Sequence, residues 1–552
     1  MLKILSLYFY YFLFIFSSVG YGLLSINKLK TKKNFEIGFI GLIGLLCLIC
    51  LSYATNFLFE HNYIHNLIVI NLGLLFCIYY FFKNLKTYKN DFKKIILIFS
   101  IIFIGILLYK NHDDFFYYHF QYTLSLINFK KIIGIGLLEH GYRTPSSIFY
   151  LNSLFYLPGI KYFLLHSGAI YVFGFSILFL LNNIFTKINT KEINSDFYLS
   201  LLSFIFITTV FYRISEHGTD RSALILIFLL SLVYIESINY KKLNSNYVLQ
   251  SFFEKIIVLV ALIVSFKSFY LIYFVFIFIW FYQIRDHLYK IEINLKNILL
   301  LFSILSPIFV LATMFLNTGC FVYPASFTCL SNLDWSINID QVNKMKSWYE
   351  LWSKSGATPN YRVDNPEIYL SNLNWVSNWF SNYFLTKVSD LILVIIVILV
   401  IVNSSLHLFT KRVKKLKQGQ PNQLIIYLVL ILLFLEWFFN HPALRYGGYS
   451  VIALLVFIPF SNYLCKFELN VNIIKKRVIF LIVISFSVYI TKNIQRIIFE
   501  NEKYGYNPIE NPFFYINKDG FDFNNILQDI KDKNYINSNY IYINKKIIKN
   551  LD

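Results

Sequence analysis

The sequence predicts an all-α, polytopic membrane protein with about 13 to 14 transmembrane helices and two long outer loops that carry short interfacial helices. Of the 552 residues, 57% are hydrophobic and only 14% are charged, whereas a soluble protein of this length exposes far more charge. Many apolar runs reach about 20 residues, enough to cross a hydrocarbon core about 30 Å thick. The runs are continuous and do not alternate, which excludes an outer-membrane barrel.

The predicted spans follow one another along most of the chain. They are expected near residues 1–24, 35–58, 67–82, 95–109, 169–185, 199–212, 223–238, 253–266, 268–282, 297–316, 391–408, 424–439, 450–463 and 478–490. Residues 1–24 are interpreted as a span, because no convincing cleavage site of a signal peptide follows them. Residues 253–282 are too long for one upright helix, so Lys267 and Ser268 are expected to divide them into two short helices.

Clusters of basic residues between the spans set the topology. They lie at residues 28–33, 83–94, 411–415 and 475–477, and the formal net charge is +20. Since no nucleic-acid-binding motif accompanies them, they are interpreted as cytoplasmic positive-inside signals and no nucleic-acid partner is expected. The polar segment 110–168 then lies outside. We expect a multi-pass protein of a bacterial cytoplasmic (inner) membrane, with the lipid bilayer as a partner and the active site facing outward.

The chain divides into six segments on this interpretation. They are N-terminal transmembrane helices (1–109), a first long outer loop (110–168), a transmembrane core (169–316), a second long outer loop (317–388), C-terminal transmembrane helices (389–495) and a polar C-terminal tail (496–552). The tail is either a small outer subdomain or a loosely ordered extension.

The first outer loop opens with His112, Asp113 and Asp114, directly after an apolar run. Acidic pairs are rare at a membrane face unless they have a function. A carboxylate there can deprotonate an acceptor hydroxyl or help to hold a metal, and His112 can orient or share the proton. Adjacent helical residues point about 100° apart, so only one of the two carboxylates is expected to face a site. Solvated acids at a helix end are the alternative.

Glu139, His140 and Arg143 lie further along the same loop. A guanidinium offers the two-pronged donor geometry that suits phosphate. The sequence that follows Arg143 supplies Thr144, Pro145 and two serines, so this stretch is either a phosphate or sugar contact or a structural turn.

Two further outer connections add charge at the same face. Asp220 and Arg221 lie near the start of a span, where an aspartate can also serve as a helix N-cap. Lys267 occupies the tight turn between two short helices, where it either snorkels or meets a phosphate.

A late connection carries His441, Arg445 and Tyr446, followed by two glycines that allow close backbone approach. Several cations and acids therefore converge on one membrane face from separated loops, as an anionic phosphate ligand with a carboxylate base requires.

Cysteines and tryptophans mark the second outer loop. Cys320 and Cys329 flank a short stretch of an outward, oxidising segment and are expected to form a disulfide. The pairs Trp348/Trp352 and Trp375/Trp379 have i, i+4 spacing, which places each pair on one helix face. They indicate either amphipathic helices at the membrane surface or aromatic packing within an outer subdomain.

At these residues the chain resembles the GT-C superfamily of integral membrane glycosyltransferases. Asp113 and Asp114 resemble the acidic motif of the first long outer loop of that family. Lys267 lies at the outer turn of a broken helical pair, and Arg445-Tyr446 resembles a late outer element. The resemblance covers the architecture of residues 1–450.

The resemblance implies a polyprenyl-phosphate-linked sugar donor and an acceptor hydroxyl on a glycan, lipid or protein. Asp113 or Asp114 would be the general base, and Arg143, Lys267 and Arg445 would neutralise the leaving phosphate. Direct displacement would invert the sugar. The acidic pair lacks Asp-x-Asp spacing, so no cofactor is predicted, and a divalent metal is left open.

Three alternatives compete with this hypothesis. A polymerase or ligase of the O-antigen type would work through outer arginines and the histidines His140, His217 and His441, without a carboxylate base. A lipid-linked glycan flippase or secondary transporter would place its ionisable groups near the bilayer midplane, whereas here they gather at one face. A non-catalytic assembly protein of a glycan system is the third.

Overall fold

The computed structural model describes residues 2–27, 35–107, 114–215, 218–239, 246–358, 363–407, 423–467, 470–505, 507–510, 536–537 and 540–541. These residues form an all-α protein, with one two-residue hairpin formed by β1 (Ile536–Asn537) and β2 (Tyr540–Ile541). The predicted fold class is confirmed. His112, Asp113, His217 and most of the C-terminal tail lie outside the described residues.

Each predicted span overlaps a helix. In chain order these helices are α1 (Leu2–Asn27), α2 (Ile37–Asn56), α3 (Tyr63–Lys83), α4 (Leu85–Ile102), α7 (Gly168–Thr190), α8 (Ser195–Val210), α9 (Gly218–Asn239), α10 (Asn246–Phe266), α11 (Val275–Gln283), α12 (Ile298–Thr318), α16 (Ser389–His407), α17 (Leu424–Asn440), α18 (Gly448–Leu464) and α19 (Val471–Tyr504). The fourth helix begins earlier than predicted, at Leu85, so most of the basic segment 83–94 is helical and is not a loop between spans. Within the described residues, eight helical segments are long and apolar enough to cross a membrane, and four shorter apolar ones accompany them. The chain is therefore a multi-pass membrane protein.

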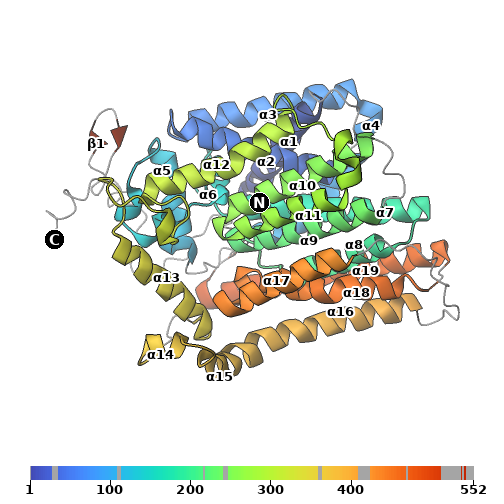
Figure 1. Ribbon diagram of the computed structural model, residues 1–552. Helices are drawn as coiled ribbons and strands as arrows, with labels where there is room; N and C mark the ends of the chain where they lie inside the picture. The colour runs from blue at the N-terminus through green and yellow to red at the C-terminus, as the bar shows by residue number, and fades with distance from the viewer. Residues whose placement is uncertain are drawn as a thin grey trace.

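Shorter helices occupy the connections. They are η1 (Phe103–Ile106), η2 (Phe115–His119), α5 (Phe120–Asn128), η3 (Ile135–Leu137), η4 (His140–Tyr142), α6 (Ser147–Ser153), η5 (Ser268–Phe274), η6 (Arg285–Lys290), η7 (Ser326–Thr328), α13 (Ile339–Lys354), α14 (Pro366–Leu370), α15 (Trp375–Trp379), η8 (Phe380–Val388) and η9 (Leu444–Tyr446). Figure 1 shows the long helices side by side, with α5, α6 and α13 gathered at one end, which we call the loop end.

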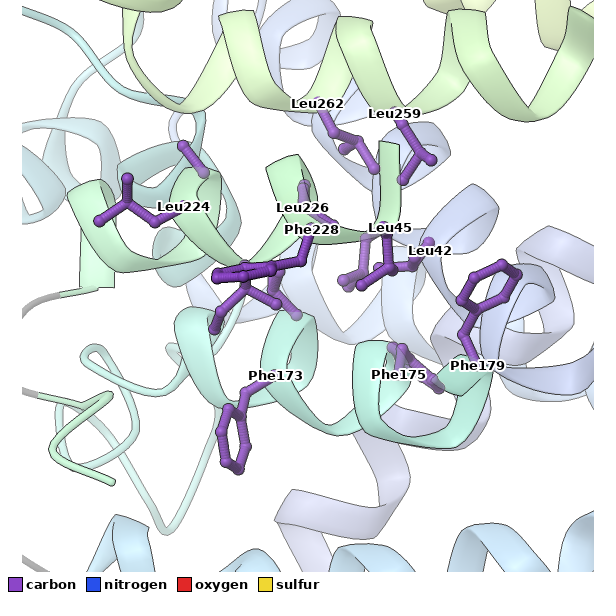
Figure 2. Close-up of a cluster of buried hydrophobic side chains, with 14 of the residues drawn as sticks. Leu42, Leu45, Phe173, Phe175, Phe179, Leu224, Leu226, Phe228, Leu259 and Leu262 are labelled. Atoms are coloured by element: carbon purple, nitrogen blue, oxygen red, sulfur yellow. The ribbon is translucent and has the colours of Figure 1, made fainter. Parts of the chain in front are cut away.

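The core lies where α2, α7, α9 and α10 meet. Leucines and phenylalanines from these four helices interdigitate there without solvent contact (Figure 2). By contrast, α3 and α16 expose most of their apolar surface, which is the surface that lipid chains would cover. The inner helices thus form a rigid support for the loops at their ends.

The break predicted at Lys267 is confirmed. Helix α10 ends at Phe266, and the backbone of Lys267 is extended before η5 and α11 continue the chain. An extended residue cannot continue the helical hydrogen-bond ladder, so the chain changes direction here. The turn leaves the Lys267 side chain at the loop end.

The tryptophan pairs differ in their surroundings. Trp375 and Trp379 are 1% and 4% exposed and lie at the start of one helical segment that runs from Trp375 to Leu406. Aromatic packing, rather than a separate surface helix, therefore explains this pair. Trp348 is 42% exposed on α13. The predicted disulfide between Cys320 and Cys329 is present.

Glycines let the first three helices approach closely. A Cβ atom on Gly20 would overlap the backbone carbonyl of Gly73 in α3, and one on Gly44 would overlap the carbonyl of Ser18 in α1. Small residues at such contacts are typical of membrane helix packing, because close backbone approach increases dispersion contacts.

We expect Gly20→Val to lower the free energy of unfolding by about 1–3 kcal/mol, because the new side chain must push α1 away from α3. Thermal unfolding of the purified protein in detergent measures this. Leu75→Val, at a position of α3 that is 60% exposed, is the control and should leave the melting temperature nearly unchanged. Equal melting temperatures for Gly20→Val and the native chain would contradict the close packing.

Candidate functional site: a chain of ion pairs at the loop end

Four charged side chains from distant parts of the sequence form one chain of ion pairs. Lys267 donates to Asp220 Oδ1, the Nε of Arg445 donates to Asp220 Oδ2 at 2.7 Å, and Arg445 Nη2 donates to Asp114 Oδ2 at 2.9 Å. Asp220 lies in the first turn of α9, and Asp114 immediately precedes η2. We call Lys267, Asp220, Arg445 and Asp114 the ion-pair chain.

The two carboxylates of this chain differ in access. The side chain of Asp220 is 5% exposed, whereas that of Asp114 is 25% exposed. A buried carboxylate is tolerated only when cations and hydrogen bonds compensate it, and Asp220 has two such cations. Asp114 is thus the carboxylate that a second molecule can reach.

Arg445 is held in its charged form. Burial by itself would lower the pKa of Arg445, but the carboxylates of Asp220 and Asp114 outweigh burial and keep the pKa well above the usual value. Its guanidinium binds both acids at once through different nitrogens, so it fixes the distance between them.

Aromatic side chains fix the backbone that carries Arg445. Four of them bind the backbone of residues 442–445, namely Trp379, Trp437, Tyr383 and Tyr270. Their hydrogen bonds are 2.8–3.1 Å long. Gly447 follows with φ +120°, a conformation that other residues rarely adopt. These constraints aim the Arg445 side chain at the acids.

Aromatic rings also pack against the two cations of the ion-pair chain. The Nζ atom of Lys267 lies 4.6 Å from the centroid of the Tyr446 ring. The guanidinium of Arg445 lies 5.9 Å from the rings of both Trp352 and Tyr446. Such cation–π contacts favour the charged forms of Lys267 and Arg445 and restrict the movement of both side chains. They use the face of the ring, so N–H donors of the two cations stay available for hydrogen bonds.

A second group of polar side chains lies beside the ion-pair chain. Arg143 donates from Nε to the carbonyl of Gly136 at 2.9 Å and from Nη1 to the hydroxyl of Tyr323 at 3.3 Å. His140 Nε2 lies 2.8 Å from the hydroxyl of Tyr349. The other ring nitrogen of His140, Nδ1, is buried and has no hydrogen-bond partner among the described residues.

Tyr349 links the two groups. Burial raises its pKa well above the usual value, Tyr446 and Tyr323 raise it further, and Arg143 and Arg445 lower it. The Tyr349 hydroxyl is therefore close enough to each guanidinium for an electrostatic interaction. Arg143 and His140 therefore face the same region as the ion-pair chain.

His441 completes the aromatic side of the site. Its ring centroid lies 5.7 Å from that of Tyr446 and 5.5 Å from that of Phe269. Burial lowers the pKa of His441 to about 4, against the opposing effect of Glu350 and with the help of nearby lysines. Its Nδ1 atom is buried without a hydrogen-bond partner among the described residues.

Not every predicted residue joins the site. Arg221 follows Asp220 on α9 and therefore points about 100° away from it. Its guanidinium lies 5.7 Å from the ring of Phe211 instead. Glu139 acts electrostatically on Tyr142 and has no ion pair with the four charged residues. The ion pairs of the ion-pair chain do not include Arg221, and its contribution to a phosphate site stays a prediction.

Sequence reasoning missed several members of the site. They are aromatic residues, namely Tyr118, Tyr270, Tyr323, Tyr349 and Trp352. Because 20% of the chain is aromatic, an individual tyrosine gives no signal. The i, i+4 spacing of Trp352 from Trp348 predicts a shared helix face and gives no signal for a charged site. Within the described residues, no group of three or more histidine, cysteine or acidic side chains could hold a metal ion.

The ion pairs of Asp220 should contribute to the stability of the folded protein. We expect Asp220→Asn to lower the unfolding free energy by about 1.5–3 kcal/mol, because Lys267 and Arg445, which are 26% and 30% exposed, lose the buried carboxylate that accepts their hydrogen bonds. Adding Lys267→Met should recover part of that loss, since one of the stranded cations is then gone. Thermal unfolding in detergent measures both. Asp286→Asn, on a side chain that is 85% exposed, is the control. Strictly additive losses in the double variant would contradict the pairing.

The lowered pKa of His441 should make the stability of the folded protein depend on pH. Its pKa is about 4 in the folded protein and 6.5 in the ordinary case, so the unfolded chain binds the proton first as the pH falls. Stability should therefore decrease from pH 6.5 to 4, by at most about 1.4 kcal/mol per pH unit for this group. We expect His441→Gln to have a flatter melting profile in that window. His287→Gln, on η6, is the control, and parallel profiles for both variants would contradict the assignment.

One known protein family matches most of the sequence, including all four residues of the ion-pair chain. A family model described as a domain of unknown function (DUF8201) matches residues 1–453. No curated protein and no solved structure matches the chain. Since the matched range is well over half of the sequence, the chain belongs to the DUF8201 family.

Proposed function

We propose that the protein is a membrane glycosyltransferase that moves a sugar from a polyprenyl-phosphate donor to an acceptor hydroxyl on a glycan or lipid. The reaction would take place on the outer face of a bacterial cytoplasmic membrane, in cell-envelope glycan synthesis or modification. One observation carries the proposal. Two cations and two carboxylates from four distant segments meet at the loop end of a multi-pass membrane protein.

The cations suit the leaving group. When the bond between the anomeric carbon and the phosphate oxygen breaks, negative charge develops on the departing polyprenyl phosphate. Lys267 and Arg445 are already ordered by Asp220 and the surrounding rings, so little reorganisation is needed as the charge develops. Arg143, which like Arg445 acts electrostatically on Tyr349, adds a further positive charge to this region.

The accessible carboxylate suits the acceptor. The acceptor oxygen attacks the anomeric carbon, its hydroxyl proton passes to Asp114, and polyprenyl phosphate leaves with the electrons of the broken bond. Asp114 is more exposed than Asp220 and uses Oδ2 for Arg445. Single displacement inverts the configuration of the sugar. Asp220 acts as a positioning residue, because it is buried between two cations.

A polymerase or ligase of the O-antigen type is the second candidate. It is favoured by His140 and His441, whose Nδ1 atoms are buried without hydrogen-bond partners among the described residues. Such an enzyme would depend on these histidines and not on Asp114. Transport is less well supported, since Asp220 and Lys267 lie at the ends of α9 and α10 and not at their middles.

The test is a set of single substitutions in cells whose surface glycans are profiled by mass spectrometry. We expect Asp114→Asn to remove a sugar from a glycan and to cause its polyprenyl-phosphate donor to accumulate, with transfer reduced by about 10²–10⁴-fold, as for loss of a general base. Asp286→Asn is the matched control and should leave the glycans unchanged.

Membrane abundance of each variant is measured in parallel, so that loss of protein is not mistaken for loss of activity. Unchanged glycans in Asp114→Asn at normal abundance, with altered glycans in a deletion strain, would overturn the transferase mechanism. Loss of glycan in His140→Gln or His441→Gln alone would favour the polymerase or ligase.

A further inference from the structure

A polar cavity, which we call the second cavity because it is a site distinct from the ion-pair chain, lies near the loop end. It has a volume of about 340 Å³ and lies between the connection that precedes α9 and the last turns of α19. Its polar lining includes Arg213, Lys492, Arg496 and Glu500. No step of the proposed transfer uses these residues.

The cavity contains more positive than negative charge. Among the described residues, three cationic side chains and the carboxylate of Glu500, which is 1% exposed, line it. The Nη2 atom of Arg496 lies 3.8 Å from Oε1 of Glu500. Lys492 donates to the carbonyl of Thr209 at 3.3 Å, so its charge is not neutralised by that bond.

Arg221 adds a fourth cation at the edge of this group. Its Nη1 atom is buried and has no hydrogen-bond partner among the described residues. Arg213 and Tyr212 both act on it electrostatically. Arg221 is therefore close to two of the residues that line the cavity, although it does not line the cavity itself. An unpaired guanidinium nitrogen in a buried position is costly unless a ligand completes it.

The ionisation of the cluster agrees with an excess of positive charge. Burial and the neighbouring Arg213 lower the pKa of Arg496 to about 10, although Glu500 opposes this. Burial also lowers the pKa of Lys492. The charged forms of groups shifted in this direction are stabilised when an anion binds beside them.

The edges of the cavity are aromatic and partly apolar. Lys492 Nζ lies 4.6 Å from the centroid of the Tyr212 ring. Phe499 also lines the cavity and is 47% exposed. A cationic pocket with an exposed aromatic rim near the end of membrane helices suits the headgroup of an anionic lipid at the membrane interface.

We propose that this cavity binds a phosphate ester group, as in the headgroup of an anionic phospholipid, at a site separate from the ion-pair chain. The same chemistry would accept a free phosphate, so the test must separate the two sources. The inference does not rest on the glycosyltransferase proposal, because it uses none of the residues assigned to transfer.

The experiment is native mass spectrometry of the purified full-length chain in neutral detergent. Phosphatidylglycerol is titrated in one arm, phosphatidylcholine in a second, and inorganic phosphate in a third, where the melting temperature is also followed. We expect phosphatidylglycerol adducts in preference to phosphatidylcholine, and roughly tenfold weaker binding in the double variant Lys492→Gln/Arg496→Gln. Stabilisation by inorganic phosphate that is lost in the variant would assign the site to a free phosphate.

Arg285→Gln/Lys290→Gln, on η6, is the charge-matched control and should bind like the native chain. Arg213→Gln, in the connection before α9, is the second test variant in case the double variant does not fold. Equal phosphatidylglycerol and inorganic phosphate binding by the native chain, the test variants and the control would overturn the proposal.

Discussion

Lys267 and Arg445 share one buried carboxylate, Asp220, at the start of α9, and the geometry of the loop end depends on this pairing. A charge removed from water must be compensated locally, so each partner constrains the other two. The pairing joins the break after α10 to the connection before α18. Through the second contact of Arg445 it also joins the start of the first long loop, at Asp114.

The aromatic richness of the chain has a structural use at this end. Indole and phenol groups hold the backbone around Arg445, and their rings cover the cations. Tryptophan and tyrosine combine a large apolar surface with one hydrogen-bonding group, so they can fix a polar loop beside lipid. Such a rigid frame suits a site in which charge must be placed before a reaction begins.

The first turn of α9 serves two different environments. Asp220 belongs to the ion-pair chain, whereas Arg221 lies over the ring of Phe211 and interacts electrostatically with Tyr212 and Arg213, which line the second cavity. Because successive helical residues are rotated by about 100°, one short stretch can contribute to both. The two positively charged regions are thus connected through a single helix start, although different residues form them.

The sequence by itself determined the membrane class, the positions of the helices and the break at Lys267, because length, hydropathy and the placement of lysines are local properties. It also marked Asp114, Asp220, Lys267 and Arg445 as polar groups at helix ends. Only the tertiary structure decided that these four are ion-paired, that Arg221 is not among them, and that Tyr349 interacts electrostatically with both Arg143 and Arg445. The reason is physical: pairing depends on the direction of each side chain in space, and composition alone does not determine which of many tyrosines or arginines point together.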